Sequence, residues 1–174
     1  MTLMLLLGIL CTASVGAACT GQPASALVRH NGWVDVRDTH VLKHVRQHDA
    51  YAREKSITAT LGVHPGFATL LGFDDQCQIL NISRLHQTAD YTTCMNYHKE
   101  QQVRRMFAAL EKLRIEPSTE FYLGWPHNIF VDDNGMVTLY DFGNYSYNAQ
   151  PRHIRAIRDT LIDSLYIIHW CWYD

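Results

Sequence analysis

The chain has 174 residues, of which 47% are hydrophobic and 18% are charged, a composition that fits one globular domain with an apolar core. Its formal net charge of -2 provides no excess of positive charge for binding nucleic acid or an anionic membrane surface. We therefore expect no nucleic-acid partner.

The first eighteen residues form a separate segment. Residues 1–10 are almost wholly apolar, and residues 12–18 are small and weakly polar. This pattern predicts a secretory signal peptide that is cleaved after Ala17 or Ala18 and leaves 19–174 as a single secreted domain with no stable membrane insertion. Because no Lys or Arg precedes the apolar run, the alternatives are an uncleaved anchor, a buried first element and a lipoprotein-type cleavage site.

Secretion would make the cysteines informative. An even number in an oxidising compartment predicts disulfides, and four cysteines allow three pairings between which the sequence does not choose. Two Asn-x-Ser patterns, at Asn81 and Asn144, are acceptor sites for glycosylation in a secreted protein. The cysteines that remain after cleavage are Cys19, Cys77, Cys94 and Cys171.

The first half of the mature chain is expected to form strands around one helix. After an Asn-Gly turn, strands are predicted over 33–36, where apolar residues alternate with polar ones, and over 40–45, which is mainly apolar. The second of these strands contains Lys43. Residues 49–61 have helical character and carry Glu54. Two further strands are expected over 67–73 and 77–85.

The second half is expected to be mainly helical. Residues 98–114 and 154–172 carry apolar side chains at helical spacing. Between them, strand-type runs over 129–131 and 136–140 flank an Asn-Gly turn, and this pattern predicts a β-hairpin.

This hairpin would bring two oxygen-bearing side chains together. Asn128 comes just before its first strand and Asp141 just after its second, so both lie at the open end of the hairpin. Mg²⁺ prefers oxygen ligands and usually sits between one or two protein groups and substrate phosphates. The spacing therefore predicts a magnesium site.

The same stretch resembles the protein-kinase family. Asn128 is followed, thirteen residues later, by Asp141-Phe142-Gly143, as an Asn of the catalytic loop precedes the metal-binding Asp-Phe-Gly motif in that family. The resemblance implies that Asn128 and Asp141 hold Mg²⁺. It also implies that Lys43 contacts ATP phosphates and that Glu54 pairs with Lys43, the alternative for Glu54 being a solvated helix surface.

The fold implied by this resemblance is α+β, a reduced two-lobed protein-kinase-like fold. The N-lobe, about 25–85, would be a small antiparallel sheet with one helix. The C-lobe, about 86–174, would be truncated, mainly helical and would contain the β-hairpin.

Three departures from the family pattern concern catalysis. Leu123 stands where the catalytic Asp is expected, and loss of a general base typically costs ~10²–10⁴-fold in rate. No Gly-x-Gly-x-x-Gly loop is present, and the segment after Gly143 is too short for a long activation loop and a peptide platform. Glu120 is the one candidate replacement base, and its alternative is a surface carboxylate.

These features lead to three functional hypotheses. The first is a secreted pseudokinase that binds Mg²⁺ and ATP through Lys43, Glu54, Asn128 and Asp141 and acts through a protein partner. The second is an active atypical kinase of the secretory pathway, or an exported effector, that transfers the γ-phosphate of ATP. The third is a disulfide-bonded secreted binding module without a nucleotide site.

Overall fold

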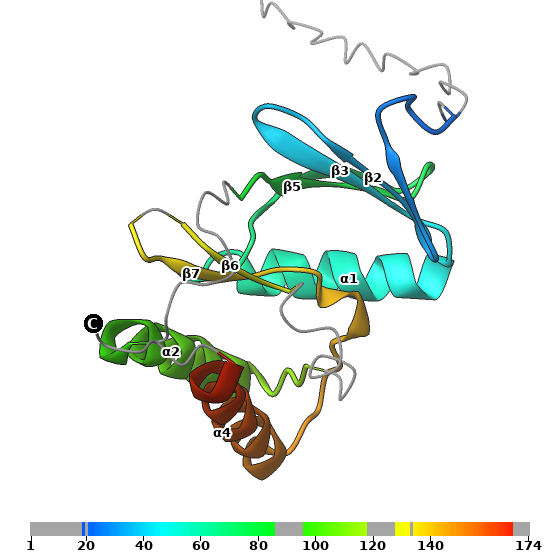
Figure 1. Cartoon of the computed structure of the whole chain (residues 1–174). Helices are drawn as coiled ribbons and strands as arrows, with labels where there is room; N and C mark the ends of the chain where they lie inside the picture. The colour runs from blue at the N-terminus through cyan, green and yellow to red at the C-terminus, as the bar shows by residue number, and fades with distance from the viewer. Residues whose placement is uncertain (1–18, 20, 86–95, 118–127, 133, 169–174) are drawn as a thin grey trace, which may run out of the picture.

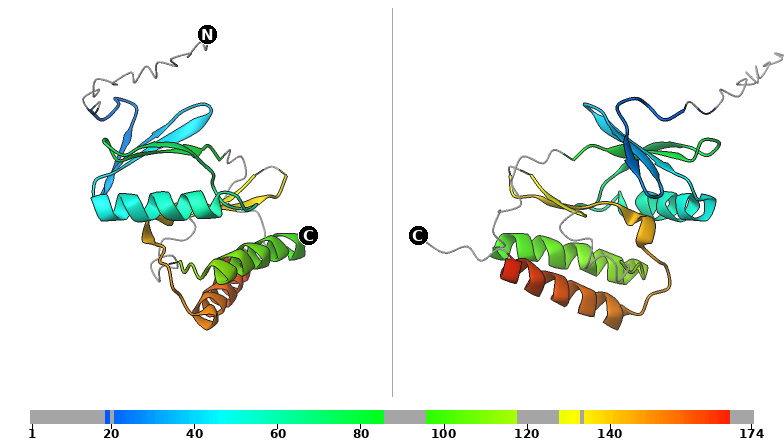
Figure 2. Two further views of the ribbon diagram at one scale, coloured as in Figure 1. Left: turned by 180° about the vertical axis from the view of Figure 1, so that it is seen from behind. Right: turned by 45° about the vertical axis from the view of Figure 1, so that its right-hand side comes forward.

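The computed structural model describes residues 19, 21–85, 96–117, 128–132 and 134–168. In these residues the fold is α+β: a five-stranded antiparallel sheet, a separate two-stranded hairpin and three α-helices (Figure 1). The sheet lies on one side of the first helix and the two other helices lie on the opposite side of it, while the hairpin lies beside that first helix (Figure 2). The signal peptide predicted for residues 1–18 lies outside the described residues.

The elements follow the chain order that the hydrophobic patterns predict. The large sheet has the order β1-β2-β3-β5-β4, and β6 pairs with β7. The helix that starts at Pro151 begins before the predicted start at 154, because proline is favoured in the first turn of a helix. The bounds are β1 Leu27–Arg29, β2 Gly32–Val36, β3 His40–Val45, α1 His48–Leu61, β4 Leu70–Asp74, β5 Ile79–Ser83, α2 Tyr97–Leu113, β6 Ile129–Val131, β7 Val137–Leu139, the 3-10 helix η1 Phe142–Asn144 and α4 Pro151–Ile168.

The two faces of the large sheet make different contacts. Lys43 and Val45 project from β3 toward α1, since alternate residues of a strand point to the same side. His44 points the opposite way and stacks on Trp33 of β2, with the ring centroids 5.4 Å apart. A disulfide joins Cys19, ahead of β1, to Cys77 in the turn between β4 and β5. Cys94 and Cys171 lie outside the described residues.

Helix α1 contributes to two apolar clusters. Its first half packs through Ala50 and Tyr51 against Val45 and Leu80 of the large sheet. Its second half packs into the main core, which contains residues from both sides of residue 85. The expected N-lobe and C-lobe therefore share this core. The main core comprises Ile57, Leu61, Phe67, Ala68, Val103, Met106, Phe107, Leu110, Ile115, Ile129, Val137, Leu139, Phe142, Tyr145, Ala149, Ile154, Ile157, Leu161 and Ile162.

The connection between α1 and β4 attaches the hairpin to the rest of the fold. Leu139 donates its backbone N–H to the Gly66 carbonyl at 2.7 Å and accepts a bond from the Ala68 N–H at 3.0 Å. Gly66 has a φ of +89°, and a Cβ at this position would lie 2.5 Å from the Met106 Sδ. Only glycine fits both this conformation and this close approach to α2.

The hairpin is also held to α2 by one buried side chain. Gln102 donates from Nε2 to the Gly135 carbonyl at 2.8 Å and accepts at Oε1 from the Val137 N–H at 2.8 Å. Gln102→Leu is therefore expected to lower the free energy of unfolding by about 1–3 kcal/mol, because a buried N–H loses its partner. Urea denaturation measures this change. Gln101→Leu, at a partly exposed neighbouring position, is the control, and an equal loss in both variants would contradict the prediction.

No helix in the described part of the chain is both long enough and apolar enough to cross a membrane.

Candidate functional site

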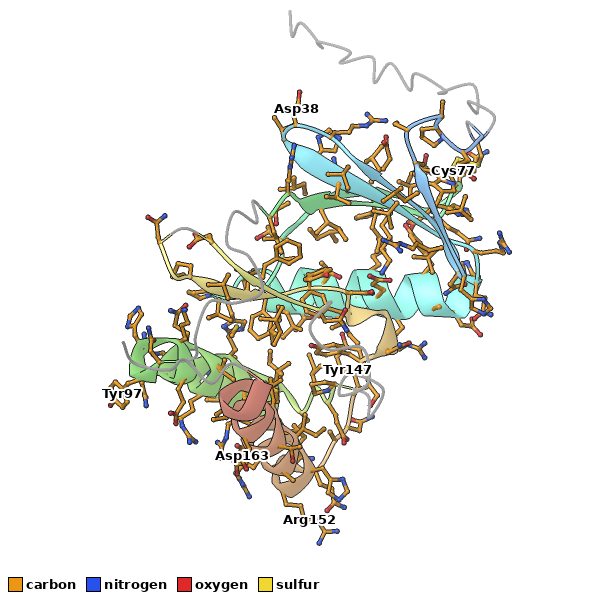
Figure 3. All side chains as sticks on the ribbon, viewed as in Figure 1. Asp38, Cys77, Tyr97, Tyr147, Arg152 and Asp163 are labelled. Atoms are coloured by element: carbon orange, nitrogen blue, oxygen red, sulfur yellow. A yellow bond between two sulfur atoms is a disulfide. The ribbon has the colours of Figure 1, made fainter. Side chains whose placement is uncertain are left out.

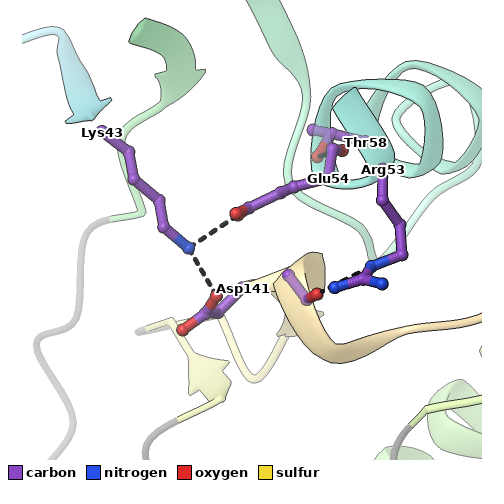
Figure 4. Close-up of polar contacts among 6 residues, drawn as sticks. Lys43, Arg53, Glu54, Thr58 and Asp141 are labelled. Carbon is purple, nitrogen blue, oxygen red and sulfur yellow. Dashed lines mark hydrogen bonds and ion pairs between the residues drawn. The ribbon is translucent and has the colours of Figure 1, made fainter. Parts of the chain in front are cut away.

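Lys43 lies at the centre of the candidate site. Its Nζ is 2.6 Å from the Glu54 Oε1 and 2.5 Å from the Asp141 Oδ1 (Figure 4). Glu54 comes from α1, and Asp141 follows β7, 98 residues after Lys43 in the chain. The fold thus brings together three side chains that sequence analysis had assigned to one site.

Glu54 is an interior residue. Its side chain is 2% exposed, because it projects from the same face of α1 as Ala50, Ile57 and Leu61. The alternative of a solvated surface position is therefore wrong for this glutamate. A buried carboxylate requires a compensating charge, and Lys43 supplies it.

Asp141 has an unusual backbone conformation for a residue with a side chain. Its φ of 62° and ψ of 71° are left-handed, a region that Asp and Asn enter more readily than most residues. Directly after it, Phe142 is 1% exposed. Its ring packs edge-on against Tyr145, with centroids 5.1 Å apart, and is tilted against the Phe67 ring, with centroids 6.1 Å apart. This buried ring anchors the chain just beyond Asp141, while the Asp141 carboxylate remains 47% exposed.

Gly143 completes the contact between this turn and α1. A Cβ at Gly143 would lie 3.1 Å from the Glu54 Oε2. The Gly143 carbonyl also accepts a bond from the Arg53 Nε at 3.2 Å. Arg53 is a residue of the site that was not predicted from the sequence, where its position next to Glu54 was the only available signal.

The pKa directions follow from burial and from the balance of charge. Burial alone lowers the pKa of Lys43, but the attraction of Glu54 and then of Asp141 outweighs it and raises that pKa above the usual value. Burial raises the pKa of Glu54; Lys43 opposes this effect in part, and the negative charge of Asp141 adds to it. Lys43 is therefore firmly protonated at neutral pH, and one cation faces two carboxylates.

Asn128 lies beside this cluster along the hairpin. Its carbonyl accepts a bond from the Tyr140 N–H at 3.2 Å, so it lies opposite the residue that precedes Asp141. The described residues contain no group of three or more His, Cys, Asp or Glu side chains that could hold a metal ion. A Mg²⁺ ion nevertheless needs only one or two protein groups when phosphates and water complete its shell. Of the two predicted ligands, Asp141 has a carboxylate that is 47% exposed, and Asn128 is placed on the hairpin by its backbone bond to Tyr140.

The rest of the predicted site lies outside the described residues. Glu120, the candidate base, and Leu123, at the position of the expected catalytic Asp, both fall in the 118–127 range. The assignment of a general base therefore stays a prediction.

Comparison with known proteins gives no family for this chain. Its sequence matches no protein-family model. A search of curated proteins likewise finds no matching sequence.

Proposed function

We propose that this protein is a secreted member of the protein-kinase-like fold that binds Mg-ATP at the Lys43 site and acts chiefly through a protein partner, as a pseudokinase. The observation that carries the proposal is the position of Lys43 between a buried glutamate and the aspartate of Asp-Phe-Gly. The Lys–Glu pair and the metal-binding Asp are two parts that kinases need for nucleotide binding.

Charge supports this assignment. Lys43, Glu54 and Asp141 together carry a formal charge of about -1 when all are ionised. A divalent cation on Asp141 would remove this excess negative charge, and the Lys43 ammonium could then turn to phosphate oxygens. Glu54, which is 2% exposed against 47% for Asp141, would remain to orient the ammonium. Bound Mg²⁺ would neutralise phosphate charge.

The order of elements also supports the proposal. The lysine stands on the third strand of an antiparallel sheet, and the glutamate stands on the helix that follows. The hairpin then leads directly into Asp141. This is the order expected for the reduced two-lobed fold. The Cys19–Cys77 disulfide fits secretion, because disulfides persist in oxidising compartments.

Apparent stability with and without nucleotide tests this proposal. Millimolar MgATP is expected to raise the melting temperature, since a ligand at about 100 times its Kd adds about 2.7 kcal/mol to stability. Asp141→Asn should abolish the part of the shift that depends on Mg²⁺, because Asn tolerates the left-handed backbone but lacks the charge. Asp163→Asn, on the distant helix α4 (Figure 3), should leave the shift unchanged.

The outcomes separate the three hypotheses. No shift with MgATP would overturn nucleotide binding and favour the disulfide-bonded binding module. A shift without phosphate transfer supports the pseudokinase. Transfer of the γ-phosphate that disappears in Asp141→Asn would instead favour the atypical kinase, and Glu120→Gln would then test the candidate base.

A further inference from the structure

The turn between β4 and β5 contacts α1 on both sides of Glu54. The Asp75 Oδ1 accepts a hydrogen bond from the Tyr51 hydroxyl at 2.8 Å and pairs with the Lys55 Nζ at 2.6 Å. Lys55 also lies over the Phe73 ring, 3.6 Å from its centroid. Asp75 thus contacts α1 at Tyr51, three residues before Glu54, and at Lys55, one residue after it.

The turn that carries Asp75 is itself fixed at several points. The Asp74 Oδ1 accepts a bond from the Cys77 N–H at 3.0 Å, and the Gln78 carbonyl accepts one from the Val45 N–H at 3.0 Å. The disulfide ties Cys77 to Cys19, across a sequence separation of 58 residues. Figure 3 shows Cys77 at the edge of the sheet, away from α2 and α4.

The two halves of α1 differ in how strongly packing holds them. Ile57 and Leu61 belong to the main core, whereas the buried apolar residues of the first half, Ala50 and Tyr51, belong to the smaller cluster with Val45 and Leu80. Glu54 lies between these halves. A tether on the first half therefore has more influence on the angle of the helix at Glu54 than one on the second half would have.

We propose that Asp75 is a positioning residue for the Lys43 site, and that the Cys19–Cys77 disulfide keeps Asp75 in place. The expected effect on the affinity for MgATP rests on the proposed function. When a dithiol reduces the disulfide, the S–S bond takes up two electrons and two protons and becomes two thiols, while the dithiol becomes a disulfide. The turn then loses its link to Cys19, the first half of α1 moves more, and nucleotide affinity falls.

The Kd for MgATP tests the coupling. We expect a Kd about fivefold or more above wild type in Asp75→Ala and in the Cys19→Ser/Cys77→Ser variant, a coupling of ordinary size. Combining Asp75→Ala with the two cysteine substitutions should raise the Kd little beyond either variant alone, since all three loosen the same contact between the turn and α1. Asp75→Asn keeps an oxygen acceptor for Tyr51 and should lie nearer to wild type. Glu111→Gln removes an exposed ion pair with Arg155 on distant helices and should leave the Kd unchanged.

Amide hydrogen exchange gives a second readout that needs no nucleotide. Exchange over 52–56 should accelerate in Asp75→Ala and in the reduced protein, relative to exchange over 58–61. If exchange responds but wild type binds no MgATP, the proposed function fails and the tether stands. If Asp75→Ala leaves both exchange and Kd as in wild type, the tether is overturned.

Discussion

Lys43→Met is expected to lower the free energy of unfolding at pH 7 by about 3–5 kcal/mol, because it leaves a buried carboxylate without its cation. The Glu54 side chain is 2% exposed, and the Lys43 side chain that neutralises it is 21% exposed. Methionine nearly matches the aliphatic part of lysine in volume, so the loss reports on charge more than on packing. Urea denaturation measures the change.

The loss should depend on pH in a defined direction. Burial already raises the pKa of Glu54 above its ordinary value of 4.5, and removal of Lys43 takes away the main opposing effect. An acid whose folded-state pKa is raised contributes stability that is complete below its unfolded pKa and is lost as the pH rises through the folded pKa. The deficit of Lys43→Met should therefore be larger at pH 8 than at pH 5.

Two further variants isolate the cause. Adding Glu54→Gln to Lys43→Met should restore much of the stability and remove the difference between pH 5 and pH 8, because no buried charge remains. Arg155→Met, which breaks an exposed ion pair with Glu111, should change stability by only about 0–1 kcal/mol. A deficit that is equal at both pH values would show that Glu54 is not the source.

Local patterns in the sequence were sufficient to predict most of the elements. Helical spacing predicts α1 and α2, and the strand-type runs around an Asn-Gly turn predict the hairpin of β6 and β7. The hairpin turn is further fixed by Asp132, whose Oδ1 accepts bonds from the backbone N–H groups of Asn134 at 2.9 Å and Met136 at 2.8 Å. Such short-range features depend on nearby residues alone, which is why they can be predicted.

The details of the site depend on contacts between distant segments. The placement of Lys43 against Asp141 could be predicted only through the resemblance to a family, since no local pattern links residues 98 positions apart. The close approach of Gly143 to Glu54 and the pairing of Cys19 with Cys77 have no local signal either. Glu54 lies three residues before Ile57 and so on the same face of α1, a spacing from which its burial could have been inferred, although most glutamates are exposed.

Phe142→Ala is expected to lower the free energy of unfolding by about 3–5 kcal/mol, as is usual when a buried aromatic side chain is truncated. Phe142 is 1% exposed and joins two segments of the core, through Phe67 ahead of β4 and Tyr145 after η1. Close-packed surroundings usually relax only in part around such a cavity, and this adds to the loss of stability. Urea denaturation at pH 7 measures the loss, and Phe142→Leu should lose less.

The same substitution should also act on the site. Asp141 holds a left-handed conformation between β7 and the anchored ring, and such conformations persist only where the surroundings enforce them. Without the ring, Asp141 should sample other conformations, and the Kd for MgATP should rise even under conditions in which the variant is fully folded. Phe142→Leu keeps an apolar anchor and should retain most of the affinity. If Phe142→Ala binds MgATP as wild type does, the Lys43–Asp141 contact alone fixes the aspartate.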